Sequence, residues 1–445
     1  MSESPSRNDS VPAKALTLFD STCLIVGIIV GAGIYQTAPD VARGAGNTLG
    51  VLAIWLCGGL LSLCGALGYA ELATAYPREG GDYVYLSRAY GRWAGFLFGW
   101  TQLAVVRPGD IAVMAFVFGT YAKSLYEPFA GCELFYAAGA TAVLTLINVI
   151  GVREGKWTQN LLTMTKLAGL LTIVGIAFFG DTTPVATEPL SPLLASLARI
   201  LVWFTYGGWN EMAYVAAEVK DSRRNIVRAL VIGTAAVTAI YLLINAAFLY
   251  RLGYAGLTQS KAVATDVVAT VFPQSGARLI AALICVSALG ALNGLIFTGA
   301  RISYAMGAEH PVFGWLGHWE PRTGTPARAL LVQGALAVAL VLALGSFINA
   351  ILYTAAAVYA FYLATTLAVI VLRRKEPHVE RPYRVLGYPV TPLLFSAVCA
   401  FLIYSAIVYK PKIAAISCLL LPSGLLLYWL SCRMACRAAR QTVSQ

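Results

Sequence analysis

The stretch Phe204-Thr205-Tyr206-Gly207-Gly208-Trp209-Asn210 lies inside an apolar span that extends from about Leu193 to Val219. Adjacent glycines are poor helix formers, so we expect the helix to break at Gly207-Gly208. Inside a bilayer, the backbone groups that a break leaves free need another hydrogen-bonding partner. The first apolar span contains a matching break signal, Gly31-Ala32-Gly33. Two interrupted spans in corresponding halves of a chain are a strong sequence indication of a transporter binding site.

Composition places the chain in a membrane. Of its 445 residues 58% are hydrophobic and 12% are charged, and the mean hydropathy is +0.71. Soluble proteins carry roughly 25% charged residues, so we expect membrane lipid to surround this chain. The net charge of +11 does not indicate nucleic acid, because the basic residues lie in short loops between apolar runs. The positive-inside rule explains that placement.

The apolar runs predict an all-α membrane protein with about 12 transmembrane helices. Most Lys and Arg residues fall on one side of the predicted membrane, which places both termini in the cytoplasm. The expected spans are about 18–38, 49–76, 94–125, 134–150, 158–179, 193–219, 230–250, 277–304, 329–344, 347–372, 390–409 and 413–432.

The two broken spans divide the chain into halves. Span 1 begins inside and span 6 begins outside, so the two five-helix halves are expected to be inverted repeats. The expected units are a cytoplasmic tail (1–16), the first repeat (17–180), the second repeat (190–373), helices 11 and 12 (388–434) and a second cytoplasmic tail (435–445).

Several motifs, taken together and in order, resemble the amino acid–polyamine–organocation superfamily and, within it, the L-amino acid transporter family. The resemblance implies a LeuT-like five-plus-five fold with helices 1 and 6 broken, and transport of amino acids across the plasma membrane. The motifs are Ile28-Ile29-Val30-Gly31-Ala32-Gly33-Ile34-Tyr35, Tyr69-Ala70-Glu71-Leu72, Gly80-Gly81-Asp82-Tyr83, Arg107-Pro108, Lys166, Phe204 to Asn210, Glu218, Arg224-Asn225, Ala291-Leu292-Asn293-Gly294, Phe297-Thr298 and Arg301.

A broken helix offers both a donor end and an acceptor end in the middle of the membrane. We predict that backbone amides of the first break bind the carboxylate of an amino acid, and that carbonyls of both breaks receive its ammonium. The alternative is that the glycines only let helices pack closely. The predicted substrate-binding residues are Ile29, Gly31, Ala32, Gly33, Phe204, Thr205, Gly207, Asn210 and Asn293.

Two of these positions have particular expectations. The resemblance implies that Phe204 also acts as a gate whose ring closes over the substrate, although ordinary packing is the alternative. Ala32 stands where the family often has a hydroxyl residue, so one side-chain hydrogen bond to the carboxylate is expected to be missing.

Lys166 lies well inside span 5, where an ammonium group is costly and needs a partner. The resemblance places it where sodium-coupled relatives hold a cation, which implies a fixed charge bridging spans 1 and 8 and sodium-independent transport. The alternative is that the side chain extends to the cytoplasmic edge.

Three more charged residues lie within spans. Arg107 and Asp110 share a helix face at a spacing of three, so we expect them to neutralise each other in a mainly structural role. Glu211 either couples transport to protons or shapes a pocket for a cationic or polar side chain, and a structural pairing with a residue such as Tyr214 remains an alternative.

At the cytoplasmic side, Glu71, Arg78, Glu218, Arg223 and Arg224 are candidates for ion pairs that break when an inner gate opens. The alternative is that they are ordinary solvated loop charges.

Cys132 is predicted to lie in the outer loop between spans 3 and 4. In animal members of the family, a cysteine in this loop links a single-span partner. A coincidental free thiol is the simpler interpretation here, so no accessory subunit is expected.

The favoured function is secondary amino acid transport by alternating access, with sodium-independent exchange. The alternative is a proton-coupled permease for polyamines or cationic amines. An enzyme is not expected, because all three histidines lie in predicted loops and the spans contain no metal-ligand cluster or nucleophile–base pair. No cofactor or metal is predicted.

Overall fold

The structure is a computed structural model. It describes residues 16–31, 33–78, 80–150, 155–178, 201–202, 205–216, 219–273, 276–320, 323, 325–409, 411–412 and 423–436. Two predicted site residues, Ala32 and Phe204, lie outside this part of the chain, and so does Glu218.

The described residues are mostly helical, and their β-structure is limited to two isolated bridges. Residues 423–436 form a further helix at the C-terminal end of the described chain. The principal helices are α1 (Leu18–Ile29), α2 (Gly33–Ala45), α3 (Thr48–Ala75), α4 (Asp82–Tyr90), α5 (Arg92–Thr101), the π-helix η1 (Gln102–Val106), α6 (Arg107–Leu125), α7 (Cys132–Ile150), α8 (Gly155–Phe178), α10 (Glu211–Tyr214), α11 (Ser222–Gln259), α12 (Val263–Ala269), α13 (Gly276–Glu309), α14 (Ala327–Leu344), α15 (Phe347–Lys375) and α16 (Val390–Tyr409).

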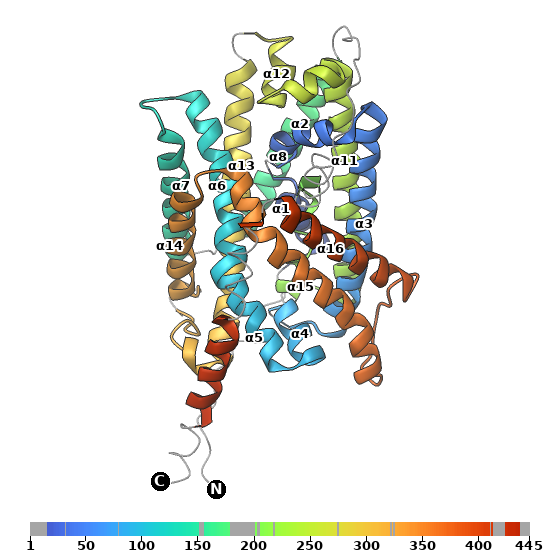
Figure 1. Cartoon of the computed structure of the whole chain (residues 1–445), viewed down its shortest axis with the longest axis vertical. Helices are drawn as coiled ribbons and strands as arrows, with labels where there is room; N and C mark the ends of the chain where they lie inside the picture. The colour runs from blue at the N-terminus through green and yellow to red at the C-terminus, as the bar shows by residue number, and fades with distance from the viewer. Residues whose placement is uncertain are drawn as a thin grey trace.

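Within the described residues, ten helical segments are long and apolar enough to cross a membrane. They form an elongated bundle, with α2 and α12 towards one end and α4 and α5 towards the other (Figure 1). The sequence predicted an all-helical membrane protein, and that fold class is confirmed. Predicted spans 6 and 12 extend over residues outside the described part.

Both predicted helix breaks are present. The first apolar span stops at Ile29, where α1 ends, and resumes at Gly33, where α2 begins. The second is helical at Thr205 and Tyr206, turns over residues 207–210 and becomes helical again at Glu211. Glycine therefore interrupts each span at the position that its sequence indicated.

Gly208 explains why the second break requires glycine. Its φ is +113°, a conformation that side chains with a Cβ rarely adopt. A Cβ on Gly208 would also lie 2.7 Å from Cγ2 of Ile28 in α1. The two broken spans therefore touch each other closely at their breaks.

An aromatic cluster packs α3 and α11 against the residues just before the second break. Trp55 of α3, Tyr206 of the broken span and Tyr241 of α11 have ring centroids between 5.1 and 6.0 Å apart. The hydroxyl of Tyr206 donates a hydrogen bond to the carbonyl of Trp55 at 2.9 Å. These contacts join α3, the broken span and α11 around one buried core.

We predict that Gly208→Ala destabilises the protein by about 1–3 kcal/mol and strongly lowers uptake, because the new Cβ meets Ile28 and the backbone conformation becomes strained. The matched control is Gly175→Ala in α8, where a Cβ meets no atom of the described residues within 4 Å. Thermal melting in detergent and uptake into proteoliposomes check both variants. Equal behaviour of the two variants would show that the conformation at Gly208 is not required.

Candidate substrate-binding site

A cavity of about 100 Å³ lies where the two breaks meet. Its wall includes residues of both breaks together with parts of α1, α5, α6, α13 and α15. The residues on the wall are Ile28, Ile29, Gly31, Gly33, Tyr69, Asp82, Phe98, Gln102, Val106, Arg107, Asp110, Met114, Thr205, Gly207, Gly208, Asn210, Glu211, Tyr214, Ala291, Leu295, Thr354, Ala355, Val358, Tyr359, Phe361 and Tyr362.

The donor end of the first break borders this cavity. Gly31 and Gly33 are both on its wall, and Gly33 is the first residue of α2. The first amides of a helix have no partner within the helix. Thr37 of α2 and Thr205 of the second break are joined by a hydrogen bond of 3.0 Å between their hydroxyls, so the start of α2 is fixed against the second broken span.

The hydroxyl of Tyr241 in α11 contacts one backbone carbonyl from each of the two broken spans. This buried hydroxyl lies 2.8 Å from the carbonyl oxygen of Ile29 and 3.0 Å from that of Thr205. The carbonyl of Ile29 also accepts a hydrogen bond from the amide of Gly31 at 2.7 Å. An ammonium that bound the Ile29 or Thr205 carbonyl would therefore compete with Tyr241. No sequence signal distinguished Tyr241 from the other tyrosines of the spans.

Of the two predicted asparagines, one lies on the cavity wall and the other is absent from the described cavity lining. Asn210 lies on the cavity wall, at the end of the second break. Asn293 of α13 is absent from the described cavity lining, and its side-chain oxygen accepts a hydrogen bond from Asn148 of α7 at 2.7 Å. The side-chain amide of Asn293 therefore joins α13 to α7, and its assignment to the substrate site stays a prediction.

The cavity wall carries a buried ion pair. Arg107 Nη2 lies 2.7 Å from Glu211 Oε1, and both side chains are buried. Arg107 Nε donates a second hydrogen bond to Gln102 Oε1 at 2.9 Å. The direct ion pair of Arg107 crosses to the second break, whereas Asp110 makes no direct ion pair with Arg107 in the described residues. The charges of Arg107 and Asp110 still interact favourably, as their spacing predicted.

A chain of hydrogen bonds connects the second break to α15 and to α4. Tyr362 donates to Asn210 Oδ1 at 2.8 Å, Asn210 Nδ2 donates to the hydroxyl of Tyr214 at 3.1 Å, and Tyr214 donates to Asp82 Oδ2 at 2.7 Å. Burial raises the pKa of the Asp82 carboxyl, and hydrogen bonds from neighbouring hydroxyls oppose that shift. This chain ties α15 and α4 to the break between them.

Lys166 of α8 is buried, and its ammonium donates a hydrogen bond to the carbonyl of Gly27 in α1 at 3.0 Å. A Cβ on Gly290 of α13 would lie 3.3 Å from Lys166 Cε. The side chain therefore lies between α1 and α13 and does not extend to the edge of the bundle.

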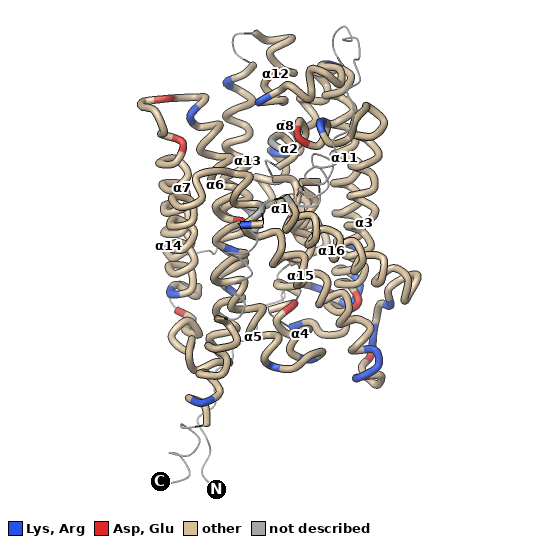
Figure 2. The backbone as a smooth tube through the Cα atoms, viewed as in Figure 1, with Lys and Arg blue, Asp and Glu red and all other residues tan. Residues whose placement is uncertain are grey.

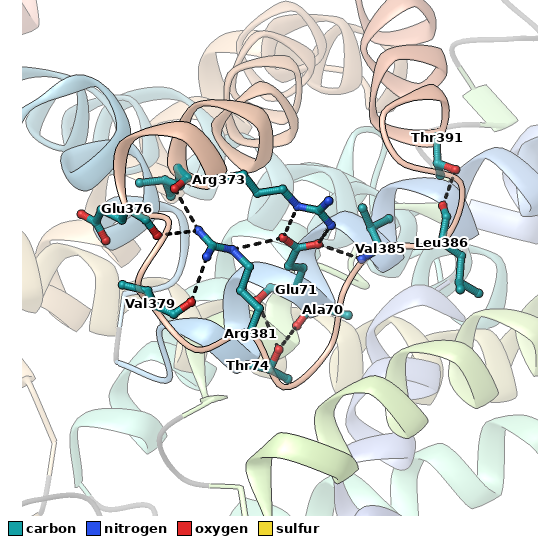
Figure 3. Close-up of polar contacts among 11 residues, drawn as sticks. Ala70, Glu71, Thr74, Arg373, Glu376, Val379, Arg381, Val385, Leu386 and Thr391 are labelled. Atoms are coloured by element: carbon teal, nitrogen blue, oxygen red, sulfur yellow. Dashed lines mark hydrogen bonds and ion pairs between the residues drawn. The ribbon is translucent and has the colours of Figure 1, made fainter.

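At the end of α3 nearest α4, the carboxylate of Glu71 is the centre of a second polar cluster (Figure 3). It accepts hydrogen bonds from Arg373 Nε at 2.8 Å and from the amide of Val385 at 2.7 Å, and Arg381 Nε lies 3.5 Å from it. Glu71 is 1% exposed. The cluster joins α3 to the end of α15 and to the loop that follows it.

A neighbouring cluster joins the same segments. Glu376 accepts hydrogen bonds from Arg88 Nη2 at 3.0 Å and from the Tyr76 hydroxyl at 2.9 Å. Burial acts to raise the pKa of Glu376, but these hydrogen bonds outweigh it and lower the pKa below the ordinary value for a glutamate. The carboxylate is therefore charged at neutral pH.

The residues of the predicted cytoplasmic cluster form ion pairs with partners other than those predicted. Glu71 pairs with arginines from the α15 end, and the exposed Arg223 pairs with Glu380 at 3.0 Å. The sequence missed Arg373, Arg381 and Glu380 because they lie far along the chain from their partners. In the described residues, no three His, Cys, Asp or Glu side chains are grouped as metal ligands would be.

Taken together, a many-span apolar bundle and a cavity at two broken helices, with charged and polar groups on its largely apolar wall, are typical of a membrane transporter. A family model described as "Amino acid permease" matches residues 16–428. The chain is 31% identical to b(0,+)-type amino acid transporter 1 of Mus musculus over 433 residues, covering 94% of this chain and 88% of that protein.

Two further relatives agree. Serine/threonine exchanger SteT of Bacillus subtilis (strain 168) is 31% identical over 426 residues, covering 94% of this chain and 96% of SteT. Large neutral amino acids transporter small subunit 2 of Homo sapiens is 31% identical over 441 residues, covering 94% of this chain and 80% of that protein. The chain belongs to the amino acid permease family, within the superfamily that its motifs resemble, and it is a transporter and not an enzyme.

We predict that Tyr241→Phe strongly lowers uptake, because the carbonyls of Ile29 and Thr205 lose their shared donor. The matched control is Tyr254→Phe, which removes a hydrogen bond of 2.9 Å to Ala42 away from the cavity wall. Initial uptake rates in proteoliposomes, normalised to folded protein, compare the two. Equal losses would contradict a special role for Tyr241.

We predict that Glu71→Gln destabilises the protein by about 2–3 kcal/mol, because the partly buried guanidinium groups of Arg373 and Arg381 lose the charge of their shared partner. Glu380→Gln is the control, since its pair with Arg223 is 65–69% exposed and is expected to contribute about 1 kcal/mol or less. Thermal melting in detergent measures the difference. Similar melting temperatures for the two variants would refute the importance of the Glu71 cluster.

Proposed function

We propose that this chain is a sodium-independent amino acid exchanger of the plasma membrane that works by alternating access. Its substrate is an L-amino acid held by backbone groups at the two helix breaks. The single observation that carries this proposal is the convergence of Gly31, Gly33, Thr205, Gly207 and Gly208 on one cavity.

The backbone at these positions suits a zwitterion. The amides at the start of α2 are placed for the carboxylate, because a helix N-terminus carries partial positive charge and unpaired donors. Gly207 lies on the wall, where its carbonyl is in reach of the ammonium. Ala32 and Phe204, the latter as a gate, remain part of the proposed site, although both are outside the described residues.

A LeuT-like arrangement of two inverted repeats, 17–180 and 190–373, is supported by the packing. Corresponding helices of the proposed repeats contact each other: α3 packs on α11, α6 on α13, and α7 on α14. Inverted repeats place the substrate site at their interface, which is where the two breaks meet.

The proposed orientation puts both termini in the cytoplasm. Lys and Arg are more abundant in the half of the bundle that carries α4 and α5 than in the half that carries α2 and α12 (Figure 2). That asymmetry favours the α4 half as cytoplasmic. The Glu71 and Glu376 clusters then lie on the inner side of the cavity, where they are suited to stabilise a closed inner gate.

Sodium independence is supported by the position of Lys166. Its ammonium is bound to the carbonyl of Gly27 in α1, and a second cation at this point would be repelled by it. Exchange is supported by the similarity to SteT, which is named as a serine/threonine exchanger.

A second candidate, a proton-coupled permease for polyamines or cationic amines, is favoured by one observation. Three carboxylates, those of Asp82, Asp110 and Glu211, are on the cavity wall beside a single guanidinium. A polyamine has no carboxylate for the start of α2, however, and the pair with Arg107 already neutralises Glu211. We therefore place this candidate second.

We propose that no accessory subunit is disulfide-linked through Cys132. The residue begins α7 and is 1% exposed, so its thiol is inaccessible to a partner cysteine.

Proteoliposomes loaded with unlabelled L-amino acids test the function. We expect internal amino acid to stimulate uptake of labelled amino acid severalfold, with no change when sodium is replaced by choline. A sodium requirement would overturn the cation role of Lys166, and putrescine uptake without amino acid uptake would favour the second candidate.

In the same assay Lys166→Ala is expected to lower exchange strongly while the protein still inserts into membranes, because the carbonyl of Gly27 in α1 loses its hydrogen bond from the ammonium. Lys123→Ala, at a partly exposed ion pair, is the control. Near-normal exchange by Lys166→Ala would remove the proposed role.

A further inference from the structure

The Arg107–Glu211 pair is only half satisfied. One nitrogen of the guanidinium, Nη2, bonds one oxygen of the carboxylate, Oε1, at 2.7 Å. The other nitrogen, Nη1, and the other oxygen, Oε2, are buried and have no hydrogen-bond partner among the residues that the structure describes. A buried unpartnered donor or acceptor is costly, and more so when it belongs to a charged group.

Both residues are on the cavity wall, and the protein holds both in place. Arg107 Nε is fixed by Gln102 Oε1 at 2.9 Å, and Gln102 belongs to the π-helix η1. The stem of Arg107 packs on Gly299, where a Cβ would lie 2.8 Å from Arg107 Cδ. Glu211 follows Asn210 directly, so it starts the helix after the second break. The pair therefore lies beside the proposed backbone site.

We propose that Arg107 and Glu211 form a side-chain subsite for a carboxamide, so that L-asparagine and L-glutamine are preferred substrates. This inference rests on the proposed amino acid transport. The amide oxygen accepts a hydrogen bond from Arg107 Nη1, and the amide nitrogen donates one to Glu211 Oε2. A carboxamide offers one acceptor oxygen and one donor nitrogen, which match the unpartnered donor Nη1 of Arg107 and the unpartnered acceptor Oε2 of Glu211.

Charge argues against the other classes of side chain. Arg107 and Glu211 neutralise each other, so the pair attracts neither an anion nor a cation strongly. Asp110 adds negative charge nearby on the wall, but a cationic side chain that reached Glu211 would also approach Arg107. An apolar side chain leaves both free atoms unpartnered, which a polar site disfavours.

Competition in proteoliposomes tests this subsite without any mutation. L-asparagine and L-leucine are of similar size and differ in the carboxamide. We expect asparagine and glutamine to inhibit labelled amino acid uptake at concentrations about tenfold or more below leucine and ornithine, the factor that about one hydrogen bond to a charged group supplies. Equal inhibition by asparagine and leucine, or strongest inhibition by ornithine, would overturn the subsite.

A double variant that removes the subsite tests whether the preference for asparagine depends on it. Arg107→Met with Glu211→Leu removes both charges together, because a single removal would leave a buried charge alone. We expect the preference for asparagine over leucine to disappear or reverse. The partly exposed pair Asp40–Arg43 of α2 provides the control, Asp40→Leu with Arg43→Met, which should keep the wild-type preference. An unchanged preference in the Arg107/Glu211 variant would contradict the proposal.

The two proposals fail differently. If no L-amino acid is transported or bound, the proposed function itself is wrong. If amino acids exchange but the carboxamide gives no advantage, only the subsite is wrong. When the double variant does not fold, as thermal melting would show, the wild-type competition series alone decides the question. Uptake by wild type at two external pH values adds a further check, because a Glu211 that stays paired with Arg107 predicts no proton requirement for exchange, and a strong proton requirement would contradict that.

Discussion

The bundle depends on how it partners the backbone at two helix breaks. In lipid, peptide groups released by a break have no water to bond. Here Tyr241 holds the carbonyls of Ile29 and Thr205 together, and the hydroxyls of Thr37 and Thr205 join the two spans. Gly208 then allows the second break to lie directly on α1. The breaks are thus stabilised by one another and by α11, and a cavity remains between them.

The polar groups around the cavity fall into layers that perform different tasks. Backbone of both breaks and the Arg107–Glu211 pair border the cavity itself. The hydrogen-bonded chain from Tyr362 to Asp82 ties α15 and α4 to the second break. Beyond it, Glu71 joins α3 to the α15 end. Movement of α15 or α4 would therefore disturb the contacts of the second break, so these contacts couple the α4 end of the bundle to the cavity.

Much of the fold was predictable because its signals are local. Apolar runs predicted the spans, and paired glycines predicted both breaks, since each acts on its own stretch of chain. Partners were not predictable, because they depend on which spans are adjacent. An arginine inside a span needs a counter-ion, and Asp110, nearest in sequence, was chosen, whereas Glu211, 104 residues away, is the partner. Glu71 was assigned incomplete partners for the same reason, and Tyr241 had no distinguishing signal.

The most direct test of the central claim is an experimental structure of the protein with an L-amino acid bound, determined by electron cryo-microscopy in lipid nanodiscs. We predict that the carboxylate lies within hydrogen-bonding distance of the amides at Gly31 and Gly33, with the ammonium at carbonyls of the second break. An amino acid bound elsewhere, or held in the cavity by side chains alone, would contradict recognition by the broken helices.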